Sequence, residues 1–183
     1  SSDADPPHVK LQSYPFGHPF TSQRQPASGL HVFFSQQSLQ GWLLFATILE
    51  DASPETHVWI AEPEGFDEAW ASIRDGVLHR ADVTQRTICD AIATPAPGRL
   101  TLPIMKRLVR GGLTVTEDDV RKAMVFAWRE LKLVVEPGGA AALAGLLAGK
   151  FDTKGKTTAV TLSGGNVDPP LFAAILEGRP VPV

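Results

Sequence analysis

A serine, two glycines and an asparagine follow a run of β-branched and apolar residues near the end of the chain. The run covers residues 157–162, and Ser163-Gly164-Gly165-Asn166 comes directly after it. Glycine lets a backbone adopt positive φ angles and approach a ligand closely, and a serine hydroxyl can meet a ring nitrogen as donor or acceptor. If the run is a parallel strand, this polar loop lies at the edge where open α/β sheets bind ligands. The alternative is a strand-to-loop turn that holds no ligand.

A second polar group, Glu136, follows residues 131–135, which are apolar except for Lys132, and precedes Pro137-Gly138-Gly139. A carboxylate at this position lies near the N-terminus of the next expected helix, where the helix dipole favours negative charge. Glu136 could therefore serve a site or cap the helix, and both interpretations stay open. The helix itself is rich in alanine, which favours close packing in a core.

Four carboxylates fall within seven positions between Glu62 and Glu68. Oxygen ligands of this kind hold hard cations such as Mg²⁺ or Ca²⁺, although an acidic loop in contact with water is the alternative. The histidines lack the spacing of metal ligands. Cys89 has no basic residue beside it, so we expect it to be buried and not nucleophilic.

Composition narrows the class of protein. The chain has 183 residues, a formal net charge of −3, 43% hydrophobic residues and one cysteine. These values predict one globular domain with a substantial core. An acidic balance without a basic stripe argues against nucleic acid as a partner. No disulfide can form within the chain, and we find neither a signal-peptide pattern nor an apolar stretch long enough to cross a bilayer, so we expect a cytoplasmic protein with no membrane partner.

The expected elements alternate between strands and helices, which predicts an α/β fold. Residues 1–28 are rich in Pro, Ser, Gln and Gly, and we interpret residues 1–38 as a poorly ordered or unrelated leader. The last strand shows no alternation of polarity, which predicts burial on both faces, as in a parallel sheet. We expect strands at residues 30–34, 57–61, 113–115, 133–135 and 158–162. We expect helices at residues 39–50, 66–73, 102–109, 117–131, 138–149 and 170–176.

Five segments occur in an order and spacing that resemble the fold-type II pyridoxal-phosphate (PLP) enzymes, in particular the threonine/serine dehydratase and serine racemase group. The resemblance covers about residues 41–178. It implies a twisted, mostly parallel α/β sheet with flanking helices over residues 39–183, which is the C-terminal half of a tryptophan-synthase-β-like PLP fold. The segments are VWIAEPEGFDEA, TICDAIATPAPGRLTLPI, LTVTEDDVRKAM, LKLVVEPGGAAALAGLL and GKTTAVTLSGGNVD.

The resemblance implies a cofactor site residue by residue. Ser163 matches the serine that hydrogen-bonds the pyridine nitrogen of PLP, and Gly164 would lie beside the ring. The backbone at Ala91 would approach the cofactor. Glu136 matches the active-site glutamate of the family and is the catalytic residue that the resemblance implies.

The resemblance also implies a site for Mg²⁺ or Ca²⁺. Glu62, the carbonyl group of Phe66, and Glu68 match the divalent-cation ligands of the racemase-like members. Glu68 stands where the family usually has an aspartate.

Two cofactor-binding parts of the family have no counterpart in this sequence. Nothing resembles the Ser-Phe-Lys-x-Arg-Gly segment with its Schiff-base lysine, and Lys10 lies in the unrelated context HVKLQS. The glycine-rich phosphate loop of the family would precede the helix that begins at Leu39, where this chain reads FFSQQSLQGW. Backbone amides cradle a phosphate only where the chain can curl tightly. We therefore expect a truncated or degenerate chain.

These observations leave three functions. The resemblance implies a PLP-dependent ammonia-lyase that eliminates water from L-threonine or L-serine and releases a 2-oxo acid and ammonia. The alternative is a non-catalytic half-domain, vestigial or paired with a separate N-terminal half, with apolar surface exposed at Trp42, Phe45 and residues 140–148. A homodimer is also expected from the resemblance. A phosphate binder that uses the Ser163–Asn166 loop is disfavoured, because Lys154 and Lys156 precede the strand and would lie at its opposite end.

Overall fold

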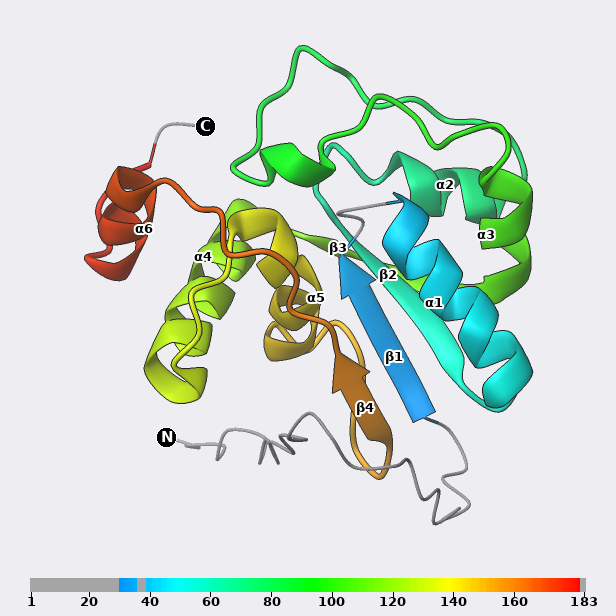
Figure 1. Ribbon diagram of the computed structural model, residues 1–183. Coiled ribbons are helices and arrows are strands. Elements are labelled where there is room, and N and C mark those ends of the chain that lie inside the picture. Colours follow the sequence, from blue (N-terminus) through cyan, green and yellow to red (C-terminus); the bar gives the residue numbers. More distant parts are fainter. Residues whose placement is uncertain (1–29, 36–38, 182–183) are drawn as a thin grey trace.

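The structure is a computed structural model, shown in Figure 1, and it describes residues 30–35 and 39–181. The expected leader lies mostly outside the described residues, and its boundary at residue 38 stays a prediction. The expected strand at residues 30–34 is confirmed as β1 (Leu30–Ser35), and it belongs to the central sheet.

The described strands form one parallel sheet in the order β3-β2-β1-β4. The other members are β2 (His57–Pro63), β3 (Val109–Val115) and β4 (Thr157–Val160). Because all pairs are parallel, the carboxyl ends of the strands meet at one edge. The arrowheads of β1 and β4 in Figure 1 point toward that edge.

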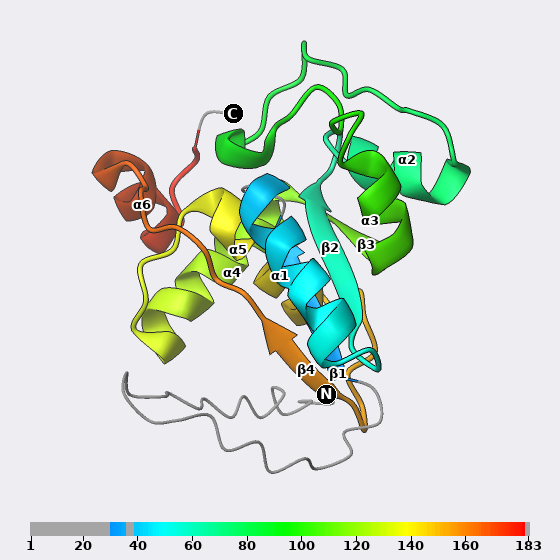
Figure 2. The same ribbon diagram turned by 45° about the vertical axis from the view of Figure 1, so that its right-hand side comes forward.

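Helices cover both faces of the sheet, as Figures 1 and 2 show. One face carries α4 (Glu117–Phe126) and α5 (Pro137–Leu147). The other carries α1 (Leu39–Ala52), α2 (Glu68–Asp75) and α3 (Leu102–Leu108). The predicted α/β class with a mostly parallel sheet and flanking helices is therefore confirmed.

Alternating residues of each strand enter two separate cores. Phe33 and Ala61 pack on the side of α4 and α5. Val32, Phe34 and Ile60 pack on the side of α1, α2 and α3. Since both faces are covered, β1 and β2 are largely apolar without alternation of polarity.

The small residues of α5 allow that helix to lie against the sheet and α4 at once. The alanines from Ala140 to Ala144 are buried, and a Cβ on Gly145 would lie 2.7 Å from Leu113 Cδ1. Close packing is confirmed for this helix. The expectation that residues 140–148 form an exposed apolar surface is wrong, because the sheet and α4 cover most of them. The side chains of Trp42 and Phe45 lie outside the described residues.

A capping box begins α4. Thr116 Oγ1 accepts a hydrogen bond from Asp119 N at 3.2 Å, and Asp119 Oδ2 accepts one from Thr116 N at 3.0 Å. The helix continues as a π-helical turn, η2 (Ala127–Leu131). The helix expected over residues 117–131 is confirmed, and Trp128 near its end is 43% exposed.

The strand expected at residues 133–135 is wrong. Lys132 adopts a left-handed conformation (φ 59°), and Leu133 N donates back to Ala127 O at 3.0 Å. The chain therefore turns at the helix end instead of pairing with a strand. Leu133 and Val134 remain exposed, and only Val135 is buried.

Two other expectations about strands need correction. Thr157 and Ala159 of β4 are exposed, because β4 is at the edge of the described sheet and pairs only with β1. Strand β3 begins at Val109 and includes Gly111 and Gly112, whereas we expected a helix up to residue 109 and a strand only from residue 113. A Cβ on these glycines would lie 2.2 Å and 2.4 Å from the rings of Trp59 and Trp70, so packing of two indoles selects glycine there.

The last helix of the described residues is α6 (Pro169–Leu176), as expected. Within residues 30–35 and 39–181, none of the helices has the length and apolar character needed to span a membrane.

Candidate functional site

The loop after β4 runs past the N-terminus of α5 at the carboxyl edge of the sheet (Figure 1). Glu136 N donates to the carbonyl of Gly164 at 3.1 Å, and Asn166 N donates to Glu136 Oε2 at 3.1 Å. The two polar motifs of the sequence are therefore bonded to each other. Glu136 occupies the cap position of α5, but its side chain makes no capping bond to that helix. The backbone N–H of Asn166 holds its carboxylate instead.

Two glycines make this contact between α5 and the loop possible. A Cβ on Gly139 would lie 1.7 Å from the carbonyl oxygen of Ser163, which is impossible without moving backbone. Gly164 has φ +79°, a conformation that favours glycine. The first turn of α5 thus packs directly on the backbone of Ser163.

Ala91 approaches the same helix turn from another part of the chain. It lies in a short 3₁₀ helix, η1 (Asp90–Ile92), and is exposed. A Cβ on Gly138 would lie 3.6 Å from the Cβ of Ala91. The structure therefore gathers Ser163, Gly164, Glu136 and Ala91 around the N-terminus of α5, as Figure 2 shows for the segments that carry them.

Ser35 joins this group, and sequence reasoning missed it. It is the last residue of β1 and is buried, and its Oγ lies 3.4 Å from Ser163 Oγ. A hydroxyl directly after an apolar strand that ends at the same edge was the available signal. Ser35 lies in the segment FFSQQSLQGW, where the phosphate loop was expected, and residues 36–38 of that segment lie outside the described residues.

A second group of candidate residues consists of Glu62 and Glu68, and Glu62 lies at the carboxyl end of β2. Its carboxylate accepts hydrogen bonds from Ala69 N at 3.2 Å and Trp70 N at 2.8 Å, in the first turn of α2. The side chain is fully buried. Burial raises the pKa of Glu62 to about 8, against the two amide bonds that lower it, and the nearby charge of Glu68 raises it further.

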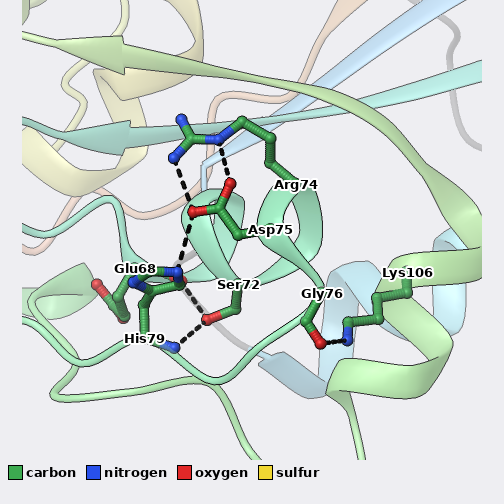
Figure 3. A network of polar contacts seen from close by, with 7 residues as sticks. All are labelled: Glu68, Ser72, Arg74, Asp75, Gly76, His79 and Lys106. Atoms are coloured by element: carbon green, nitrogen blue, oxygen red, sulfur yellow. Dashed lines mark hydrogen bonds and ion pairs between the residues drawn. The ribbon is translucent and has the colours of Figure 1, made fainter.

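Glu68 is the other member of this second group. Thr94 Oγ1 donates to its Oε1 at 2.6 Å, while Oε2 is buried and meets no hydrogen-bond donor among the described residues. Burial is the main cause that raises the pKa of Glu68. Figure 3 shows the surrounding contacts: Ser72 Oγ donates to the carbonyl of Glu68 at 2.6 Å and accepts from His79 N at 2.8 Å. These bonds fasten the loop after α2 beside the glutamate.

The acidic segment is therefore not simply a loop in water. Glu62 and Glu68 are buried, while Glu64 is exposed. Two buried carboxylates whose charges interact, one with an unpartnered oxygen, fit the oxygen chemistry that Mg²⁺ or Ca²⁺ requires. Among the described residues, no three His, Cys, Asp or Glu side chains gather as a metal-binding group. A cation here would accordingly need main-chain oxygen, which the Phe66 carbonyl was expected to supply.

The remaining reactive side chains lie elsewhere. Cys89 is buried as expected, and burial, followed by the charge of Glu117, raises the pKa of its thiol to about 12. His31 accepts a hydrogen bond from Trp59 Nε1 at 3.0 Å, near the start of β1. Lys156 precedes β4, and its Nζ donates to the carbonyl of Asp152 at 2.6 Å, so it lies at the strand end away from Ser163.

The fold and the grouped residues correspond to a known class. Residues 43–164 match the family of pyridoxal-phosphate dependent enzymes. The chain belongs to this family, as its segments indicated.

Individual relatives narrow the comparison. The chain is 35% identical over 142 residues to the serine racemase of Dictyostelium discoideum, and the aligned region covers 75% of this chain and 44% of that protein. It is 29% identical over 174 residues to the L-threonine ammonia-lyase of Thermotoga maritima, covering 90% and 43%. The structure of maize serine racemase superposes with a TM-score of 0.69 at 27% identity, covering 84% of this chain and 48% of that one. The chain thus spans about half the length of the relatives that it matches.

Proposed function

We propose that this chain supplies the C-terminal half of the active site of a PLP-dependent L-threonine or L-serine ammonia-lyase. The reaction would eliminate water across the α and β carbons and release a 2-oxo acid and ammonia. The observation that carries the proposal is the gathering of Ser163, Gly164, Glu136 and Ala91 around the N-terminus of α5. Relatives named as ammonia-lyases and serine racemases support it.

Each of these residues has a distinct task in the proposal. PLP, when bound, supplies the electron sink for the reaction. Ser163 would meet its ring nitrogen with a neutral hydroxyl, which does not hold that nitrogen protonated as a carboxylate would. Gly164 would leave room beside the ring. Glu136, oriented by the Asn166 amide at Oε2, would present its other oxygen to a proton or hydroxyl at the site.

Activity would also need a lysine and a phosphate loop, which the family carries in segments that have no counterpart among the matched residues. We propose that a polypeptide with the rest of the fold supplies them, on the same chain or a separate one, and that the assembled enzyme acts on a small amino acid as a homodimer in the cytoplasm. The competing function is a half-domain without catalysis.

The test combines cofactor binding with complementation. The chain alone is incubated with PLP, reduced with borohydride and mapped by peptide analysis, and we expect label scattered over surface lysines. Co-expression with the N-terminal half of the Thermotoga maritima enzyme should yield a reducible visible band on one lysine and 2-oxobutanoate from threonine.

Ser163→Ala should weaken PLP binding by the complemented protein about tenfold, because one hydrogen bond to the ring is lost. Thr153→Ala, in the turn before β4, is the matched control and should bind as the unaltered protein does. Equal affinity in both variants would contradict the role of Ser163. A single labelled lysine in the chain alone would show that the chain builds its own cofactor site.

We also propose that Glu62, Glu68 and the carbonyl of Phe66 bind Mg²⁺ or Ca²⁺. Saturating cation should raise the melting temperature by several degrees, since a ligand at 100 times its dissociation constant stabilises by about 2.7 kcal/mol. The effect should be larger at pH 8.5 than at pH 6, because protons compete for carboxylates whose pKa values are raised. Glu68→Gln should abolish the shift, whereas Glu64→Gln, which alters an exposed carboxylate nearby, should keep it. A shift that survives in Glu68→Gln would exclude this site.

A further inference from the structure

A cavity of about 600 Å³ lies between α4 and the segment that ends α6. Its cationic lining consists of Arg121 and Lys122 from α4 and Arg179 from beyond α6, and Asp118 adds one carboxylate. None of these residues belongs to the proposed cofactor or cation sites. Figure 1 shows α4 and α6 on the side of the molecule away from α2 and α3.

The end of α6 determines where Arg179 lies. Gly178 adopts φ +68° and donates its N–H to Ile175 O at 3.2 Å, and Arg179 N donates to Ala174 O at 2.9 Å. This pair of bonds is a Schellman motif, which ends a helix and reverses the chain. The reversal brings the Arg179–Val181 segment to the cavity opposite α4.

Arg121 is the unusual member of the lining. Its Nε atom is sealed from solvent and meets no hydrogen-bond acceptor among the described residues. Lys122, by contrast, pairs with Asp118 at 2.6 Å, and Arg179 pairs with Glu177. A buried donor without a partner costs about 1–3 kcal/mol, and more when it is charged. Arg121 forms no ion pair with the carboxylates of the described residues, so an anion in the cavity would give its guanidinium group a partner.

Charge and polarity indicate the kind of anion. Lys122 and Arg179 each have a carboxylate partner, Asp118 and Glu177, so Arg121 leaves one unpaired positive charge at the cavity, in a protein whose net charge is −3. The remaining lining includes the apolar side chains of Val125, Ile175 and Val181. A phosphate monoester carries about −1.5 to −2 charges at pH 7 and has several strong acceptor oxygens. We propose that this cavity binds a phosphate monoester that carries an apolar group, with Arg121 as its principal ligand.

The proposal does not depend on the proposed enzymatic function, and its test uses the full 183-residue chain without PLP. Phenyl phosphate is titrated calorimetrically and by heteronuclear NMR, with benzoate and inorganic phosphate as comparison ligands. We expect phenyl phosphate to bind at least tenfold more tightly than either, because benzoate lacks the second charge and inorganic phosphate lacks the ring. The affected amide signals should come from α4 and residues 175–181.

Arg121→Gln should weaken phenyl phosphate binding at least tenfold, and Arg179→Gln should weaken it to a smaller degree. Arg129→Gln removes one exposed arginine from η2, outside the cavity lining, and should leave binding unchanged. Circular dichroism is used to check that each variant is folded. If Arg121→Gln does not fold, Arg179→Gln provides the test. No binding at millimolar ligand, equal binding by Arg121→Gln and the unaltered chain, or signals confined to the Ser163–Asn166 loop would each overturn the proposal.

Discussion

The thiol of Cys89 shows how burial decides chemistry at a single residue. The side chain is inaccessible, and its pKa is raised to about 12 by burial and by the negative charge of Glu117. At pH 8 the folded protein should therefore react with Ellman's reagent at least a thousandfold more slowly than the chain in guanidinium chloride, because the thiolate is the nucleophile. Stopped-flow absorbance of both states provides the comparison. Similar rates would mean that Cys89 is accessible in the folded protein.

His31 predicts how stability depends on pH. Its Nδ1 accepts the Trp59 Nε1 hydrogen bond, which requires a neutral imidazole. Burial, followed by the charges of His57 and Lys156, lowers the pKa of His31 from its ordinary 6.5. As the pH falls below 6.5, His31 is protonated in the unfolded chain before it is protonated in the folded protein. The folded protein therefore loses stability as the pH falls from 6.5 through the lower pKa of His31 in the folded state.

We expect His31→Gln, which keeps an acceptor but does not titrate, to reduce the loss of stability between pH 7.5 and pH 5. Urea unfolding at both pH values measures the difference. His79→Gln is the control, since His79 pairs with Asp75 at the surface. The same loss in His31→Gln and in the unaltered protein would exclude His31 as its source.

At the scale of elements, the contact between α5 and the Ser163 loop is the tightest in the candidate site. Gly139→Ala should destabilise the protein by at least about 3 kcal/mol, because the added Cβ would lie 1.7 Å from Ser163 O and backbone must move. Gly138→Ala makes the same chemical change one residue earlier, where the nearest atom is Ile92 Cγ2 at 3.4 Å, and should cost less than about 1 kcal/mol. Chemical denaturation of both variants tests the prediction. Comparable stabilities would show that the loop moves away from α5 freely.

Most elements could be predicted from the sequence, and two failures among the strands have different causes. The helix periodicity of α4 and the alanine-rich run of α5 are local patterns, so they were recognised. Residues 133–135 are apolar, but the left-handed turn at Lys132 directs them away from the sheet. Gly111 and Gly112 lie between the helix and the strand that the sequence predicted, whereas indole packing from distant residues places them in β3. The first error arose from a local turn at the end of a helix, and the second arose where contacts between distant segments overrode a local pattern.

At the scale of the whole molecule, the sheet has an unprotected edge within the described residues. β4 pairs with β1 alone, and its exposed positions include Ala159. Open edge strands pair with other chains, and a lysine at the edge opposes this. We therefore expect concentration-dependent self-association that Ala159→Lys reduces. Sedimentation velocity over a range of concentrations measures it.

Val83→Lys adds the same charge at an exposed loop position and is the control for that experiment. An equal effect of both lysines would mean that net charge, and not the edge strand, governs association. Supplying the N-terminal half of the family fold should suppress the association as well, if that half covers β4.

The sequence alone determined the fold class, the family and the identities of the residues at the candidate site. Side-chain chemistry, strand ends and collinear segments are properties of the chain, so Ser163, Glu136 and Ala91 could be named from it. Only the tertiary structure decided that these residues meet at one helix N-terminus, that Ser35 joins them, and that Glu62 and Glu68 are buried with raised pKa values. Distances, burial and desolvation depend on which segments pack together. Those contacts are made between residues far apart in the chain, where no local pattern records them.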